Sequence, residues 1–287
     1  MRWRGGRRYG GIEDRRGAGG RFTAGGGVGV GVMALSLAGY FLFGINPLLL
    51  IETAGLSAPE SQEQGRPGVP QDQAGQFLDA MLSSTTDVWR SAFESMGRTY
   101  VPPQSLVLYE GATGTACGTG QSAMGPFYCP GDQRIYLDLA FFRELQTRFA
   151  APGDFAQAYV IAHEVGHHVQ QILGTDAMVR RAQGAAEDQA EANRYSVALE
   201  LQADCFAGVW AANAARVSGG QIALEVGDLE EGLRAAEAIG DDTLQRQTQG
   251  RVVPDSFTHG SSAERMAWLG RGYDQRDPAS CNTFEGL

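Results

Sequence analysis

The chain has 287 residues, a formal net charge of −10, and 43% hydrophobic against 20% charged residues. The composition is that of a globular protein, and the length leaves room for one large domain with accessory segments. The acidic balance argues against a nucleic-acid partner, because the chain would repel a phosphate backbone.

The first 45 residues predict a basic tail followed by a membrane anchor. Residues 1–21 hold seven arginines against two acidic residues, which gives a local charge of +5 (7 − 2). Residues 24–45 are uncharged and largely apolar over a length that crosses a bilayer. By the positive-inside rule we expect a cytoplasmic tail over 1–23, a single transmembrane helix over 24–45 in the inner membrane, and an extracytoplasmic remainder. A cleaved signal peptide is the alternative, but no small-x-small site follows a short apolar core.

Residues 46–75 are polar, contain prolines and lack an apolar period, so they predict a flexible linker. The folded domain is then expected over 76–287, beginning with a helix that ends near Gly97 and continuing with short strands between residues 105 and 137. We therefore predict an α+β fold, mainly helical with a small antiparallel sheet. Further helices are expected at about 138–149, 154–173, 187–215, 222–239 and 261–271.

Four cysteines suit a compartment outside the cytoplasm. Cys117 and Cys129 flank a Gly-rich segment and could close a hairpin loop, whereas Cys205 and Cys281 could join the end of the chain to a core helix. Four cysteines allow three pairings, so the connectivity stays open. Free thiols in a reducing compartment are the alternative if the membrane prediction is wrong.

The helix expected from residue 154 contains His163-Glu164-Val165-Gly166-His167. Residues four apart share a helix face, so His163 and His167 can bind one Zn²⁺ ion through their imidazoles. Glu164 projects to the flank, where it can reach a zinc-activated water as a general base. A pair of surface histidines is the alternative, but these two border an apolar helix stripe. His168 lies about 100° around the helix and is expected to serve packing.

A catalytic zinc site usually has a third protein ligand. The motif that adds a third histidine is excluded, because Gln170 and Leu173 replace its Gly and His. Glu200, in the long helix over 187–215, is the expected third ligand. Asp204, one turn later, is expected to accept a hydrogen bond from the free N–H of the His163 imidazole and so to orient it. The rival ligands on this helix are Glu187, Asp188, Glu191 and Asp204 itself.

The fourth histidine, His259, stands six residues before Arg265, which lies at the start of the last expected helix. A hydrolase must stabilise an oxyanion, and His259 and Arg265 are the remaining candidates. The alternative is that both serve capping and surface ion pairs.

With these residues assembled, the chain resembles the predicted neutral zinc metallopeptidase family of bacterial membrane proteins over nearly its whole length. The resemblance includes the opening from Met1 to Gly17, Tyr128-Cys129-Pro130, and the stretches around His163, Glu200 and His259. It implies a zincin-like domain of the Glu-zincin type, in which a late His and an Arg six residues on assist the transition state.

The predicted function is a membrane-anchored peptidase with one zinc ion per chain, acting on peptide or protein substrates. Two alternatives stay open. In the first, zinc only ties two helices together in a non-catalytic envelope protein, although the sequence shows no obvious fourth ligand for such a site. In the second, the zinc hydrolase cleaves a non-protein amide, such as a cell-wall crosslink.

Overall fold

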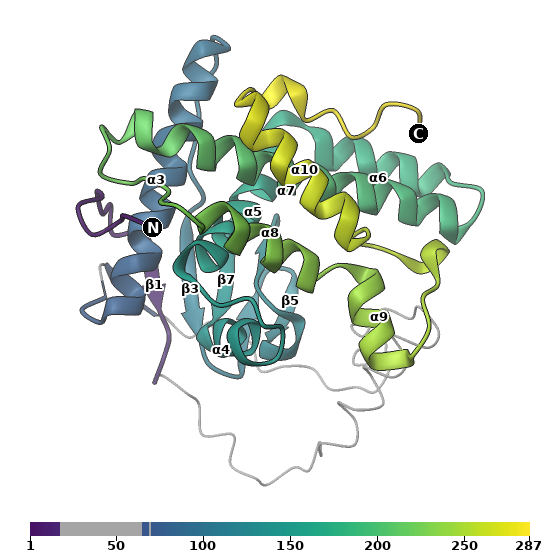
Figure 1. Cartoon of the computed structure of the whole chain (residues 1–287), viewed down its shortest axis with the longest axis horizontal. Helices are drawn as coiled ribbons and strands as arrows, with labels where there is room; N and C mark the ends of the chain where they lie inside the picture. The colour runs from purple at the N-terminus through teal and green to yellow at the C-terminus, as the bar shows by residue number, and fades with distance from the viewer. Residues whose placement is uncertain (18–64, 69) are drawn as a thin grey trace, which may run out of the picture.

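The computed structural model describes residues 1–17, 65–68 and 70–287, in which helices surround a small sheet (Figure 1). The strands of the main sheet are β1 (Ile12–Asp14), β2 (Arg66–Gly68), β3 (Ser105–Tyr109), β6 (Phe127–Cys129) and β7 (Arg134–Asp138), and β4 (Ala112–Thr115) pairs with β5 (Gly118–Gln121) as a separate hairpin. The α-helices are α3 (Gln73–Ser95), α4 (Leu139–Thr147), α5 (Asp154–Leu173), α6 (Thr175–Ala185), α7 (Gln189–Val217), α8 (Asp228–Ala238), α9 (Asp241–Gln249) and α10 (Ser262–Gln275). The expected α+β class, mainly helical with a small sheet, is confirmed.

The main sheet is mixed, in the order β2-β1-β3-β7-β6. Its three central strands run parallel, and only the edge strands β2 and β6 pair in antiparallel fashion. The prediction of an antiparallel sheet is therefore wrong for the centre. The sequence carries the reason, because Leu106–Tyr109 and Ile135–Leu137 are continuous apolar runs buried on both faces, which is typical of parallel strands.

The helices largely follow the predicted boundaries. α5 is followed by Gly174, which adopts a left-handed conformation at φ 84°, and α10 begins with a capping box between Ser261 and Glu264. The helix expected at 222–239 begins later, at Asp228, and α6 and α9 were not expected. Both are short and contain few large apolar residues, so they were not recognised as helices in the sequence.

Small residues at the helix crossings bring α5, α7 and α10 close together. A Cβ atom on Gly166 of α5 would lie 3.1 Å from the Cα of Ala203 on α7. One on Gly272 of α10 would lie 1.9 Å from the carbonyl oxygen of Cys205. Because α7 packs between its two neighbours at these points, polar side chains from all three helices can meet.

The opening residues belong to this domain and are not a separate tail. β1 pairs with β3 in parallel, and Ile12 is buried. Trp3 is also buried and packs edge-to-face on Phe77 of α3, with ring centroids 5.2 Å apart. Asp79 of α3 accepts hydrogen bonds from the backbone of residues 10 and 11. Figure 1 shows this first segment beside α3 and the sheet.

The expected division of the chain changes accordingly. The folded part includes residues 1–17, and β2 and the first turn of α3 lie within the expected linker over 46–75. The predicted anchor over 24–45 lies outside the described residues. Within the described ranges, no helix has the length and apolar character needed to cross a membrane. Because β1 and β3 lie in one sheet, the expected separation of residues 1–17, as a cytoplasmic tail, from an extracytoplasmic domain is wrong.

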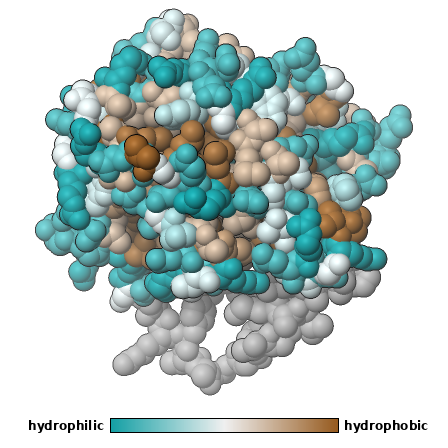
Figure 2. All heavy atoms as spheres, viewed as in Figure 1, coloured by the Kyte–Doolittle hydropathy of each residue, from teal (hydrophilic) through white to brown (hydrophobic). Residues whose placement is uncertain are grey.

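Two disulfides join Cys117 to Cys129 and Cys205 to Cys281. The first closes the segment around β5 onto the edge strand β6, and the second ties the end of the chain to α7. Disulfides of this kind are typical of proteins outside the cytoplasm. On the face drawn in Figure 2, apolar residues form small groups separated by hydrophilic ones.

Docking of the first residues gives a stability prediction. Trp3→Ala should lower the free energy of unfolding by about 3–5 kcal/mol, as is usual when a buried aromatic side chain is removed. Arg7→Ala is the control, because the Arg7 side chain is 70% exposed and its ion pair with Asp87 lies at the surface. Urea unfolding measures both variants, and equal stabilities for the two would show that this segment is not part of the core.

Candidate metal centre

α5 carries His163 and His167 on one face, and α7 supplies Glu200 opposite them. The Nε2 atoms of the two histidines are 3.1 Å apart. Glu200 places one oxygen 3.2 Å from His163 Nε2 and the other 3.4 Å from His167 Nε2. Ligand atoms about 2.0–2.1 Å from a tetrahedral zinc ion would be separated by about 3.3–3.4 Å, so these three donors have the spacing of zinc ligands.

The donor chemistry also fits a metal ion. His163 Nδ1 lies 2.8 Å from Asp204 Oδ1, and a carboxylate oxygen can only accept, so Nδ1 carries a proton and Nε2 is the nitrogen left for a metal ion. His167 Nδ1 lies 2.9 Å from Gln170 Oε1, which leaves its Nε2 in the same state. Two lone pairs and a carboxylate that face one another repel unless a cation lies between them. The site therefore fits the zinc expected from the sequence.

The charges around the histidines favour a positive charge at this point. Burial lowers the pKa of His163, but the carboxylates of Asp204 and Glu200 outweigh it and raise the pKa to about 10. Burial raises the pKa of Glu200, but His167 and His163 hold it well below its usual value. The pocket thus takes up a proton or a metal cation between the imidazoles and Glu200.

Asp204 is a buried carboxylate with partners from two further helices. Besides His163, it accepts hydrogen bonds from Tyr159 Oη at 2.6 Å, and from Arg265 Nε at 2.8 Å and Nη2 at 3.0 Å. Burial raises the pKa of Asp204, but Arg265 and His163 lower it to about 2. The charge on Asp204 is therefore retained, and the paired contact with the guanidinium fixes its orientation.

Arg265 lies behind His163, on the side of Nδ1. Its Nη2 atom lies 3.5 Å from His163 Nδ1, and the residue is 3% exposed. The sequence placed Arg265 beside the reacting group as an oxyanion partner. The structure instead engages its guanidinium with Asp204 and Tyr159, on the side of the imidazole away from Glu200.

His259 lies on the open side of the site. Asp241 accepts hydrogen bonds from the backbone N–H groups of residues 258, 259 and 260, and its other oxygen lies 3.3 Å from His259 Nδ1. Partial burial lowers the pKa of His259, but Asp241 and Glu200 raise it above its ordinary value. A cavity of about 270 Å³ is lined by His259, Glu200 and residues of α6 and α7, including Arg180.

Glu164 is buried beside the two histidines, with 7% of its surface exposed. Burial raises the pKa of this carboxyl above its usual value, although the histidines oppose the change. A carboxylate with a raised pKa is a better proton acceptor near neutral pH.

Three of the rival ligands, Glu187, Asp188 and Glu191, lie around the start of α7 and outside the group of possible metal ligands. Asp188 caps the helix by accepting from the backbone of Glu191, and the Glu191 carboxylate accepts from the backbone of Glu187. His168 points away, with Nε2 2.8 Å from the Val101 carbonyl oxygen. These contacts are structural.

A second acidic cluster in the described part of the chain consists of Asp154, Asp228 and Glu231. The Met1 ammonium lies 2.7 Å from Asp154 and 3.2 Å from Asp228, so this cluster already has a cation.

Tyr159, Gln170 and Asp241 were not expected from the sequence. Tyr159 stands four residues before His163 on the same helix face, and this spacing is a signal that could have identified it. Asp241 lies in a short helix that is distant in sequence from His163 and His167, and no local pattern links it to His259.

Comparisons with known proteins identify the family of the chain. A family model described as "Putative neutral zinc metallopeptidase" matches residues 1–284. The chain is 49% identical to the uncharacterized protein YpfJ of Escherichia coli K12, over 99% of both chains. It is 42% identical to the uncharacterized proteins Mb2605 of Mycobacterium bovis and Rv2575 of Mycobacterium tuberculosis H37Rv, over 74% of this chain and 72% of each relative. No solved structure matches the chain.

The partners of Asp204 predict how its replacement acts. Asp204→Asn should lower the free energy of unfolding by about 3–5 kcal/mol, because Arg265 is then buried without its counter-ion. It should also weaken zinc binding by about 10–100-fold, through the lost carboxylate partner of His163.

Adding Arg265→Met to Asp204→Asn separates the two effects. The double variant no longer buries an unpaired charge, so we expect much of the stability to return while zinc binding stays weak. Chemical unfolding and zinc titration of both variants measure this. If Asp204→Asn alone kept full stability and zinc affinity, Asp204 would not have the assigned role.

Proposed function

We propose that the chain, which belongs to the family of neutral zinc metallopeptidases, hydrolyses peptide bonds with one zinc ion held by His163, His167 and Glu200. The observation that carries this proposal is the convergence of three possible ligand atoms, 3.1–3.4 Å apart, beside a buried carboxylate. Three protein donors in the described part of the chain, rather than four, favour a catalytic over a closed structural site.

Zinc bound there would supply a Lewis acid that lowers the pKa of a water molecule and polarises a carbonyl group. The protein side chains do the rest. Glu164 takes the proton from the attacking water and later delivers it to the leaving amine. Its raised pKa supports both roles, because the group must gain and lose a proton within one turnover.

His259 is the candidate for the developing negative charge on the substrate oxygen. Its side chain is 46% exposed and lines the same cavity as Glu200, so a substrate can reach it. The raised pKa keeps more of the imidazole in its charged, hydrogen-bond-donating form near neutral pH. Asp241 supports this role by anchoring the backbone on both sides of the ring.

Arg265 is assigned a positioning role in place of direct oxyanion contact. Its guanidinium holds the Asp204 carboxylate, which holds His163 by its Nδ1–H group. These contacts support an indirect role, in which Arg265 acts on the metal site by holding Asp204 and, through it, the ligand His163.

The test compares wild type with Glu164→Gln and Glu144→Gln, for zinc content and casein hydrolysis. Glu164→Gln should keep about one zinc per chain and lose activity by about 10²–10⁴-fold, the usual contribution of a general base. Glu144 is exposed on α4, so its replacement is a matched control that should change neither property. Full activity in Glu164→Gln would contradict the assigned base, and wild type without zinc would contradict the proposed function.

A further inference from the structure

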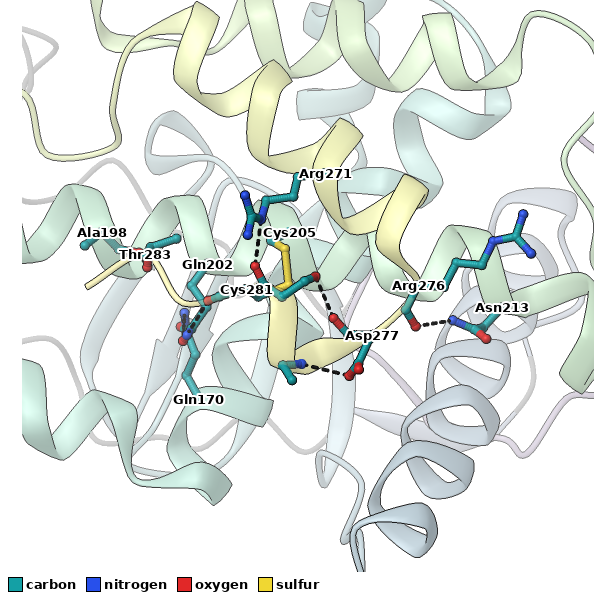
Figure 3. Close-up of a disulfide and its surroundings, with 12 residues drawn as sticks. Gln170, Ala198, Gln202, Cys205, Asn213, Arg271, Arg276, Asp277, Cys281 and Thr283 are labelled. Atoms are coloured by element: carbon teal, nitrogen blue, oxygen red, sulfur yellow. Dashed lines mark hydrogen bonds between the residues drawn. A yellow bond between two sulfur atoms is a disulfide. The ribbon is translucent and has the colours of Figure 1, made fainter. Parts of the chain in front are cut away.

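A chain of hydrogen bonds leads from His167 through two glutamines to the end of the polypeptide. His167 Nδ1 lies 2.9 Å from Gln170 Oε1, and Gln170 Nε2 lies 3.2 Å from Gln202 Oε1. Gln202 Nε2 in turn donates to the carbonyl oxygen of Cys281 at 2.9 Å. Figure 3 shows Gln170, Gln202 and Cys281 lying side by side between α5, α7 and the C-terminal segment.

Two backbone carbonyls fix the direction of this chain. The Cys281 carbonyl can only accept, so Gln202 must turn its amide nitrogen toward it and its oxygen toward Gln170. Gln170 Nε2 also donates to the Leu199 carbonyl oxygen at 2.6 Å, which requires the same orientation of its amide. Gln170 Oε1 therefore faces His167 and needs a proton from Nδ1. This places the free lone pair of His167 on Nε2, beside His163 and Glu200.

Burial prevents the two amide groups from reversing their orientation. Gln170 is 0% exposed and Gln202 is 8% exposed, so a reversed amide would bury two oxygens against each other without water to separate them. Each glutamine has partners for both ends of its amide.

The far end of the chain of bonds is itself firmly held. The Cys205–Cys281 disulfide ties Cys281 to α7, and Thr283 Oγ1 donates to the Ala198 carbonyl oxygen. Arg271 Nε donates to the Ser280 carbonyl oxygen at 2.8 Å. The segment after α10 is thus held by α10 before Cys281 and by α7 at and after it (Figure 3).

We propose that Gln170 and Gln202 are positioning residues that fix the tautomer and ring orientation of His167, with the disulfide-held carbonyl of Cys281 as their anchor. The proposal rests on the metal site proposed above. The two imidazoles are then held differently: His163 donates to the charged Asp204, whereas His167 donates to a neutral amide that depends on the C-terminal segment.

The test uses Gln170→Met and Gln202→Met, which keep side-chain length and remove the amide. Gln170→Met should weaken zinc binding by about 10–100-fold, as is usual for loss of a ligand's hydrogen-bond partner. Gln202→Met should cause a smaller loss, because Gln170 keeps the Leu199 carbonyl. Gln171→Met is the matched control: Gln171 is the next residue on α5 but contacts Tyr128 and the Pro130 carbonyl, so zinc affinity should not change.

Two measurements decide the result. Competition with a chelator gives the dissociation constant for zinc. The ring ¹⁵N signals of the metal-free protein, which has 4 histidines, report which nitrogen of His167 carries the proton. The proposal predicts protonated Nδ1 in wild type and in Gln171→Met, and loss of this single tautomer in Gln170→Met.

The outcomes separate this proposal from the proposed function. If Gln170→Met kept the wild-type affinity for zinc and unchanged ring signals, the positioning role of the two glutamines would be overturned. The proposed metal site would not be affected. A wild type that binds no zinc would overturn the proposed function, and the ring signals of the metal-free proteins would still decide whether Gln170 fixes the tautomer.

Discussion

The buried charge of Asp204 is the constraint on which the rest of the site depends. A carboxylate without exposed surface must be neutralised and hydrogen-bonded, and its partners come from α5 and α10 while Asp204 itself is on α7. The three helices can meet at this point because Gly166 and Gly272 leave no side chain at the crossings. The same contacts turn the His163 ring toward Glu200. The packing of the three helices therefore also sets the geometry of the metal centre.

The charge balance of the site follows from these contacts. Arg265 compensates Asp204, which leaves the Glu200 carboxylate to balance part of the charge of a divalent cation. His167, in contrast, donates to the neutral amide of Gln170. One imidazole is thus made more basic by a charged partner, and the other is only oriented. The fold supports both through α7, which carries Asp204 toward α5 and, one turn earlier, Glu200 toward the two histidines.

The sequence predicted the parts of the protein that have a local signal. Helical spacing predicted that His163 and His167 share a face. Two carboxylates one helical turn apart indicated Glu200 and Asp204. The contacts of Arg265 with Asp204 and Tyr159 were not predicted, because sequence spacing does not show which side of an imidazole a guanidinium meets. β1 was missed because three residues in a Gly- and Arg-rich segment carry no strand pattern, and their pairing with β3 is fixed only by tertiary contacts.

The most direct test of the account is the position of the metal in crystals of the purified protein, measured by anomalous diffraction at the zinc edge. The account predicts one peak within bonding distance of His163 Nε2, His167 Nε2 and the Glu200 carboxylate. A peak at the cluster of Asp154, Asp228 and Glu231 instead, or no peak in zinc-saturated crystals, would contradict it.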